Sequence, residues 1–178
     1  MAQRAAKLLA KAQEHMEAGD MANALLVLRE CARLEHDVPR LKVATLINLA
    51  NAESELGDVG AAREHYDAAL VLAPANFEAH ANFGMLACEH GPRERAISHL
   101  RQAVQADEQW FDGWFNLANL YSTARGQEAE ALACYERALK VQPASPDALI
   151  NLSACLVDAG RLADGVARAA EAVRLHEA

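Results

Sequence analysis

Apolar residues recur along residues 111–143 at the spacing of two successive α-helices. In the first segment, Leu117, Ala118 and Tyr121 fall within about 60° of Trp114 when each residue turns the helix by about 100°. The second segment places small or aromatic side chains at i, i+4 and i+7, which are Ala131, Tyr135 and Ala138. Each segment therefore predicts a helix with one apolar stripe that must be buried against another element.

A glycine and a proline mark the ends of these two segments. Gly126 lies between them and suits a tight turn, because glycine tolerates a positive φ angle. Pro143 follows the second segment and should stop that helix, because proline lacks an N–H and clashes with the preceding turn. Residues 111–143 are therefore predicted to form a helix–turn–helix unit.

The same frame recurs along the chain. The positions equivalent to Trp114 are 38, 34, 34 and 35 residues apart, and they are Leu8, Leu46, His80, Trp114 and Leu149. The predicted turns fall at Gly19-Asp20, Gly57-Asp58, Gly91-Pro92, Gly126 and Gly160-Arg161. A fixed period in this range is typical of stacked repeats that share a continuous core. We therefore expect a single all-α domain over residues 1–178, with five repeats at approximately 5–38, 39–76, 77–110, 111–145 and 146–178.

Two repeats depart from the common pattern. The connector at residues 35–39 is longer than the others, and Pro39 suits the first position of a helix, so the second repeat should begin there. Gly165 stands where the other repeats carry alanine, and it should weaken its helix by roughly 0.5–1 kcal/mol.

The repeat frame resembles the tetratricopeptide repeat (TPR) family. The matching residues are Trp114-x-x-Leu117-Ala118-x-x-Tyr121, then Ala131-x-x-x-Tyr135, Ala138 and Pro143, with alanine at 118 in place of the usual glycine. The resemblance implies a right-handed superhelical solenoid of ten antiparallel helices. It also implies a concave groove lined by the first helix of each repeat, and a non-catalytic scaffold for protein–protein interaction.

Composition and charge narrow the class of partner. The chain has a net charge of −8, and its lysines and arginines form no cluster, so we expect neither nucleic-acid binding nor attraction to anionic membranes.

The longest apolar run of the first sixteen residues, Leu8-Leu9-Ala10, is too short for a signal-peptide core or a membrane span. The four cysteines are widely separated and form no CxxC pair, which favours a reducing compartment, and we expect a cytoplasmic protein.

The sequence contains no recognisable catalytic, metal-binding or phosphate-binding motif. The seven histidines show no helix-compatible metal spacing with a nearby cysteine, and the chain lacks a glycine-rich phosphate loop, an HExxH motif and a nucleophile elbow. We therefore expect no catalytic residue, no metal site and no cofactor.

Asparagine recurs in register with the repeats. An asparagine lies two residues after the Trp114-equivalent position in repeats two to five, at Asn48, Asn82, Asn116 and Asn151. Two residues correspond to about 200° of helix, so each should point away from the core of its own repeat. Stacked repeats would align these four residues, which we call the asparagine ladder. Asn51 and Asn119 lie three residues further on, on nearly the same face.

An amide offers donors and an acceptor, so it can bind the main chain of a peptide of any sequence. The ladder resembles that of the TPR domain of O-linked N-acetylglucosamine transferases, which implies an extended peptide held in the groove. Phe115 is the best candidate for a side-chain anchor, although it could equally pack on a neighbouring first helix. Other groove-facing apolar residues are expected at Ile47, Met85 and Ile150.

The sequence therefore predicts a scaffold that binds an extended, neutral-to-basic protein segment. Two alternatives remain open. The chain could be a structural solenoid that self-associates through its terminal repeats, where Val166 and Val173 are the larger apolar residues of an alanine-rich helix. It could also be the adaptor portion of a larger complex, such as a glycosyltransferase.

Overall fold

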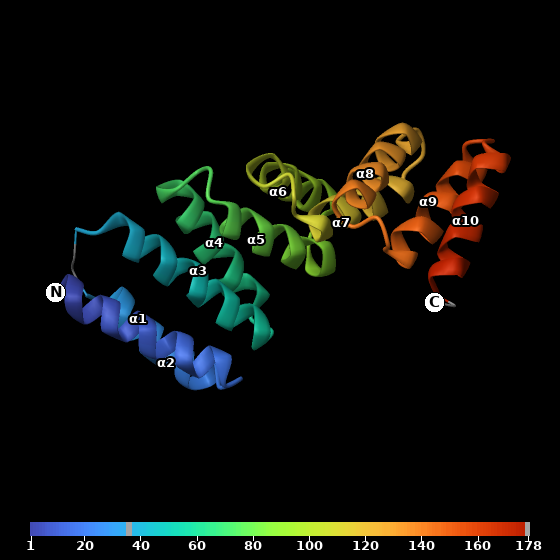
Figure 1. Ribbon diagram of the computed structural model, residues 1–178. Coiled ribbons are helices and arrows are strands. Elements are labelled where there is room, and N and C mark those ends of the chain that lie inside the picture. The colour runs from blue at the N-terminus through green and yellow to red at the C-terminus, as the bar shows by residue number, and fades with distance from the viewer. Residues whose placement is uncertain (35–36, 177–178) are drawn as a thin grey trace. The chain divides into compact units, whose positions relative to one another are not determined.

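The computed structural model describes residues 1–34 and 37–176 (Figure 1). Within these residues the chain forms ten α-helices and no β-strand. Residues 35 and 36, in the long first connector, lie outside the described residues. The helices are α1 (Ala2–Glu17), α2 (Met21–Ala32), α3 (Pro39–Glu55), α4 (Val59–Leu72), α5 (Phe77–His90), α6 (Arg93–Ala106), α7 (Phe111–Ser122), α8 (Glu128–Val141), α9 (Pro146–Asp158) and α10 (Leu162–His176).

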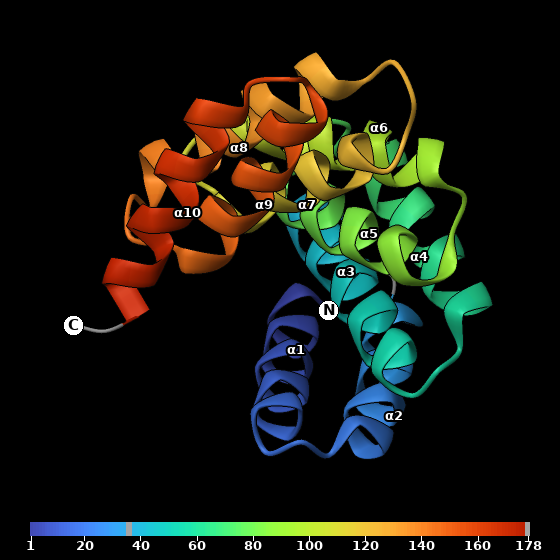
Figure 2. The ribbon, with the colours of Figure 1, turned by 90° about the vertical axis from the view of Figure 1, so that its right-hand side faces the viewer.

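The helices gather in two compact units, which are described separately. Unit 1 comprises residues 1–92 and holds α1 to α5, and unit 2 comprises residues 93–178 and holds α6 to α10. In unit 1, α1 pairs with α2, α3 pairs with α4, and α5 packs on α3 and α4. Figure 2 shows the hairpin of α1 and α2. In unit 2, α6 packs on α7, α7 pairs with α8, and α9 pairs with α10.

The turn at Gly57-Asp58 ends one helix and begins the next. Gly57 has a φ of +82°, and the Asp58 N–H donates to the Glu53 carbonyl oxygen at 2.8 Å. The Asp58 side chain then accepts a hydrogen bond from the Ala61 N–H at the start of α4. Left-handed glycine also occurs at Gly19, Gly126 and Gly160, so four predicted turns are confirmed.

The third turn is made differently. Gly91 has a φ of −122° and a ψ of 174°, which is extended backbone rather than the left-handed conformation. Proline disfavours helical backbone in the residue before it, and Pro92 follows Gly91 directly. Proline also sets other boundaries as predicted: α3 begins at Pro39, and α8 ends two residues before Pro143.

The predicted apolar stripes are buried. Leu117, Ala118 and Tyr121 of α7 are buried, and so are Ala131, Tyr135 and Ala138 of α8, the helix that pairs with α7. Trp114 is only half-buried, and its Nε1–H donates to the Glu108 carbonyl oxygen at 2.9 Å. In unit 1, one core cluster includes Ile47, Ala62, Tyr66, Ala79 and Phe83, so α3, α4 and α5 share it.

Gly165 allows α10 to approach α9 closely. A Cβ atom added at Gly165 would lie 2.8 Å from Val157 Cγ2 and 2.9 Å from the Ser153 carbonyl oxygen. Both distances are shorter than Cβ contacts in real proteins, and the carbonyl belongs to the backbone of α9. The sequence suggested a weakness at this position, whereas the structure shows that the missing side chain permits the packing of two helices.

We therefore expect Gly165→Ala to lower the free energy of unfolding by about 1–3 kcal/mol, because an added methyl group overpacks the contact. This loss should exceed the stabilisation of roughly 0.5–1 kcal/mol that alanine gives relative to glycine in an unstrained helix. Urea denaturation followed by circular dichroism measures the difference. Gly60→Ala in α4 is the matched control, since its only near neighbour is Asp58 Oδ1 at 3.7 Å. A Gly165→Ala variant stabilised as much as the control would show that the contact is not tight.

Candidate functional site

Two amides and a phenol meet in unit 1 where three helices adjoin. Asn51 lies on α3, Tyr66 on α4 and Asn82 on α5. The Tyr66 hydroxyl donates to Asn51 Oδ1 at 2.6 Å, and Asn82 Nδ2 donates to the same oxygen at 2.9 Å. We call these three residues the first amide cluster. It joins the two helices of one hairpin to the helix that follows them.

Unit 2 contains a second amide cluster with the same connections. The Tyr135 hydroxyl on α8 donates to Asn119 Oδ1 on α7 at 2.6 Å, and Asn151 Nδ2 on α9 donates to that oxygen at 3.1 Å. The sequence separations are 15 and 31 residues in the first cluster and 16 and 32 in the second. The recurrence indicates a feature of the repeat.

The two tyrosines are suited to hold these amides. Burial raises the pKa of the Tyr66 hydroxyl, and the nearby carboxylates of Glu78 and Glu55 raise it further. Burial is also the main cause that raises the pKa of Tyr135. Both phenols are therefore protonated at neutral pH and act as donors, which orients the Asn51 and Asn119 carbonyl oxygens.

The pairing differs from the expected ladder. We expected Asn48 and Asn82 to be neighbouring rungs, but the hydrogen bond joins Asn51 to Asn82. Asn48 is only 8% exposed, so it offers little surface to a ligand. Asn51, Asn82, Asn119 and Asn151 are all half-buried. The half-buried Asn116 donates through Nδ2 to the Asp112 carbonyl oxygen in its own helix, at 2.8 Å.

The apolar residues expected in the groove have different surroundings. Ile47 is 1% exposed and belongs to the core of unit 1, so its predicted exposure to a ligand is wrong. Phe115 is half-buried, stacks on Phe111 with ring centroids 5.6 Å apart, and meets the Tyr135 ring edge-on at 6.1 Å. The aromatic contacts of Phe115 thus lie within its own hairpin of α7 and α8, whereas the alternative had placed it on a neighbouring first helix, and part of the residue stays accessible.

A pocket of about 410 Å³ contains the first amide cluster. Asn51, Tyr66 and Asn82 all line it, together with methionine, glutamate, serine and leucine side chains of unit 1. A different pocket of about 480 Å³ lies beside Trp114 and Cys134 in unit 2, and no asparagine lines it. Burial raises the pKa of the Cys134 thiol to about 11, so this sulfur is a poor nucleophile at neutral pH. The asparagine-lined pocket is therefore the better candidate for binding.

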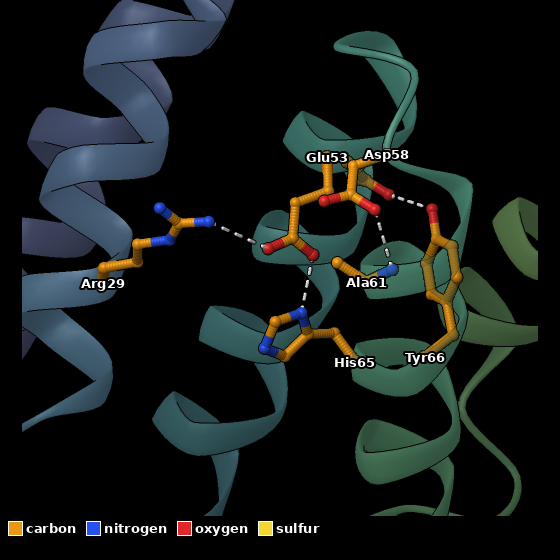
Figure 3. A network of polar contacts seen from close by, with 7 residues as sticks. Arg29, Glu53, Asp58, Ala61, His65 and Tyr66 are labelled. Atoms are coloured by element: carbon orange, nitrogen blue, oxygen red, sulfur yellow. Dashed lines mark hydrogen bonds and ion pairs between the residues drawn. The ribbon is translucent and has the colours of Figure 1, made fainter.

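Sequence reasoning missed a buried carboxylate in unit 1 that contacts a histidine and an arginine. The side chain of Glu53 is 2% exposed, and its Oε2 atom lies 2.6 Å from His65 Nδ1. Arg29 Nη2 lies 3.8 Å from Glu53 Oε1, so α2, α3 and α4 each contribute one residue to this group (Figure 3). The isolated positions of these residues in the sequence gave no signal, because the contacts depend on how three helices stack.

The described residues hold no group of three or more histidine, cysteine or acidic side chains arranged to bind a metal ion. Within the same residues, no helix combines the length and apolar character that crossing a membrane requires.

Comparison with known families identifies the repeat. Models of the tetratricopeptide repeat match residues 9–77, 47–109 and 111–155. These matches span most of the chain and cover both units. Among curated proteins, none matches this chain in sequence.

Solved structures of MamA have the same fold. MamA AMB-1 matches with a TM-score of 0.84 and 20% sequence identity, over 99% of this chain and 94% of that one. MamA from Desulfovibrio magneticus RS-1, residues 41 to the end, matches with a TM-score of 0.83 and 21% identity, over 98% and 96%. At this identity the likeness concerns the fold, and it confirms an all-α solenoid of helix hairpins.

Proposed function

Because the chain belongs to the tetratricopeptide repeat family, we propose that it is a non-catalytic scaffold that binds an extended peptide segment through asparagine side chains. The family and fold support a protein-interaction scaffold in general. The amide clusters support the finer proposal, because they place paired, half-buried amides in a pocket of unit 1 and repeat the arrangement in unit 2.

The hydrogen bonds within a cluster leave polar atoms for a ligand. The described structure gives the Asn82 side chain one hydrogen bond, from Nδ2 to Asn51. An asparagine amide has a second N–H and a carbonyl oxygen that can accept. One amide can therefore bind both the C=O and the N–H of a peptide main chain, whatever the side chains of that peptide.

The repeat spacing suits an extended ligand. Neighbouring helices pack about 8–10 Å apart, and an extended chain advances about 3.3 Å per residue. Successive first helices would thus meet the ligand every two to three residues. We propose that Asn51, Asn82, Asn116, Asn119 and Asn151 contact the peptide, that the accessible edge of Phe115 contacts an apolar side chain, and that the buried Asn48 contributes less.

The charge of the chain indicates the class of partner, and its cysteines indicate the compartment in which the protein acts. The net charge of −8 favours a neutral-to-basic segment over an acidic one. The four cysteines are free thiols, which suits a reducing compartment, and we propose that the protein acts in the cytoplasm.

The test is the affinity of a peptide selected from a displayed library of random 12-residue sequences. Asn82→Ala combined with Asn151→Ala should weaken binding at least tenfold, because each change removes main-chain contacts. Asn23→Ala is the matched control, since Asn23 is exposed on α2 and bonds Asp20. Equal affinity of a folded double variant, or a library that yields no binder, would contradict the proposal.

Self-association is a second candidate, favoured by the surface of α10. Leu162, Val166 and Val173 are 61%, 59% and 56% exposed, and they recur at helical spacing. Light scattering over a concentration series tests this role. A concentration-dependent mass that Val166→Lys abolishes would support it, and a monomer at every concentration would exclude it.

A further inference from the structure

The pocket that holds the first amide cluster is rich in methionine. Three of the four methionines of the chain line it: Met16 from α1, Met21 from α2 and Met85 from α5. All three are half-buried, so their thioethers form part of the pocket wall and are not sealed in the core. We call this site the methionine pocket. Methionine is unbranched, flexible and polarisable, so a wall of methionines can change its shape to fit a ligand side chain.

Two carboxylates belong to the same pocket. Glu55, at the end of α3, and Glu89, on α5, both line it and are both exposed. Glu89 Oε2 lies 3.5 Å from His90 Nε2, and the ion pairs of the described residues do not include Glu55. No lysine or arginine lines the pocket. Its charge is therefore negative, and it complements a cation.

We infer that the methionine pocket takes the side chain of one lysine or arginine from the bound segment. This inference rests on the proposed peptide-binding function and names the residue that the segment must supply. The aliphatic stem would lie along Met16, Met21 and Met85, and the charged head would reach Glu55 and Glu89. Long basic side chains commonly divide in this way between apolar surface and polar surroundings. Asn51 and Asn82, in the same pocket, would hold the adjoining main chain.

The second amide cluster lacks the same lining. Counted from Asn51 and Asn119, Glu55 corresponds to Thr123. Counted from Asn82 and Asn151, Met85 corresponds to Ala154 and Glu89 to Asp158. The amides are thus common to both units, whereas the combination of methionine and two glutamates belongs to unit 1. A basic anchor should therefore be required at one place along the ligand.

Pools of nine-residue peptides test this assignment. The central residue is fixed as lysine, arginine, norleucine or glutamate, and the other positions are randomised. The lysine and arginine pools should bind at least fivefold more tightly than the norleucine pool, which has a similar stem without charge, and the glutamate pool should bind least. Rising salt should reduce this preference, because exposed charges are screened.

Methyl NMR locates the contact. On titration with the lysine pool, the methyl resonances of Met16, Met21 and Met85 should shift, while that of Met1, which is 76% exposed and outside the pocket, should not. In the Glu55→Gln/Glu89→Gln variant, the affinities for the lysine and norleucine pools should differ by less than twofold. The affinity for the norleucine pool should equal that of the unchanged protein. Glu64→Gln/Asp67→Asn removes the same charge from exposed positions of α4 outside the pocket and should retain the preference.

The outcomes separate the two proposals. Binding of every pool without preference for a cation would overturn the basic anchor and leave the peptide-binding function standing. A preference that survives Glu55→Gln/Glu89→Gln, or pocket methionine resonances that do not shift, would also overturn it. Failure of all pools to bind would overturn the peptide-binding function and the anchor together.

Discussion

Replacing Phe83 with alanine should lower the free energy of unfolding by about 3–5 kcal/mol, the range found for buried aromatic residues. Phe83 is fully buried in the core that α3, α4 and α5 share. Its ring stacks on Tyr66 with centroids 5.3 Å apart, and Tyr66 in turn holds Asn51. The substitution would leave a cavity beside the first amide cluster and remove an aromatic contact.

The loss can be assigned to unit 1 by choice of probe. Both tryptophans, Trp110 and Trp114, lie in unit 2, so their fluorescence follows that unit while circular dichroism follows all helices. Phe115→Ala is the matched control, because that ring is only half-buried and its removal should cost less. A Phe83→Ala variant whose stability fell by less than about 1 kcal/mol would show that the core relaxes around the gap.

Replacing His65 with alanine should also lower the free energy of unfolding, by about 2–4 kcal/mol. Removing His65 takes away the closest partner of the buried Glu53 carboxylate, and a buried carboxylate that loses such a contact is strongly destabilising. The remaining partner of Glu53, Arg29 at 3.8 Å, is half exposed and more distant than His65. The estimate lies toward the lower end of the usual range, because the His65 side chain is 32% exposed and water can partly replace it.

A double variant separates the effect of the buried carboxylate from that of simple packing. Adding Glu53→Met to His65→Ala removes the carboxylate that has lost its closest partner and fills most of its volume, so urea denaturation should show part of the stability restored. Apolar replacement of buried ion pairs is often neutral or stabilising. If Glu53→Met lowered the stability of the His65→Ala variant further, the remaining contacts of the carboxylate would be stabilising, and the loss of its closest partner would not explain the effect of His65→Ala.

The positions of the turns and the apolar faces of the helices can be predicted from the sequence, because both depend on residues that are close together along the chain. Gly57-Asp58 closes one helix with left-handed glycine and caps the next with aspartate, and both roles can be recognised from two neighbouring residues. The apolar stripe of α7 follows from the helical period alone. Gly91 departs from this pattern because the following proline overrides the preference of glycine.

The contacts between hairpins are harder to predict. The helical period places Asn48 and Asn51 on similar faces, but it does not fix how far the next hairpin is offset along the stack. In the structure Asn48 and Ile47 are buried, and the hydrogen bond to Asn82 comes from Asn51. The same limit concealed the approach of Arg29 to Glu53 and the grouping of three methionines, since each joins helices of different hairpins.

The contact between the paired amides and a bound peptide is measured most directly by NMR of the asparagine side-chain amides. During titration with the library-selected peptide, the resonances of Asn51 and Asn82 should shift along the same saturation curve as the peptide's fluorescence anisotropy. The resonance of Asn23, which is exposed on α2, should stay in place. Saturation of the anisotropy with the Asn51 and Asn82 resonances unmoved would show that the peptide binds elsewhere and would contradict the proposed role of these amides.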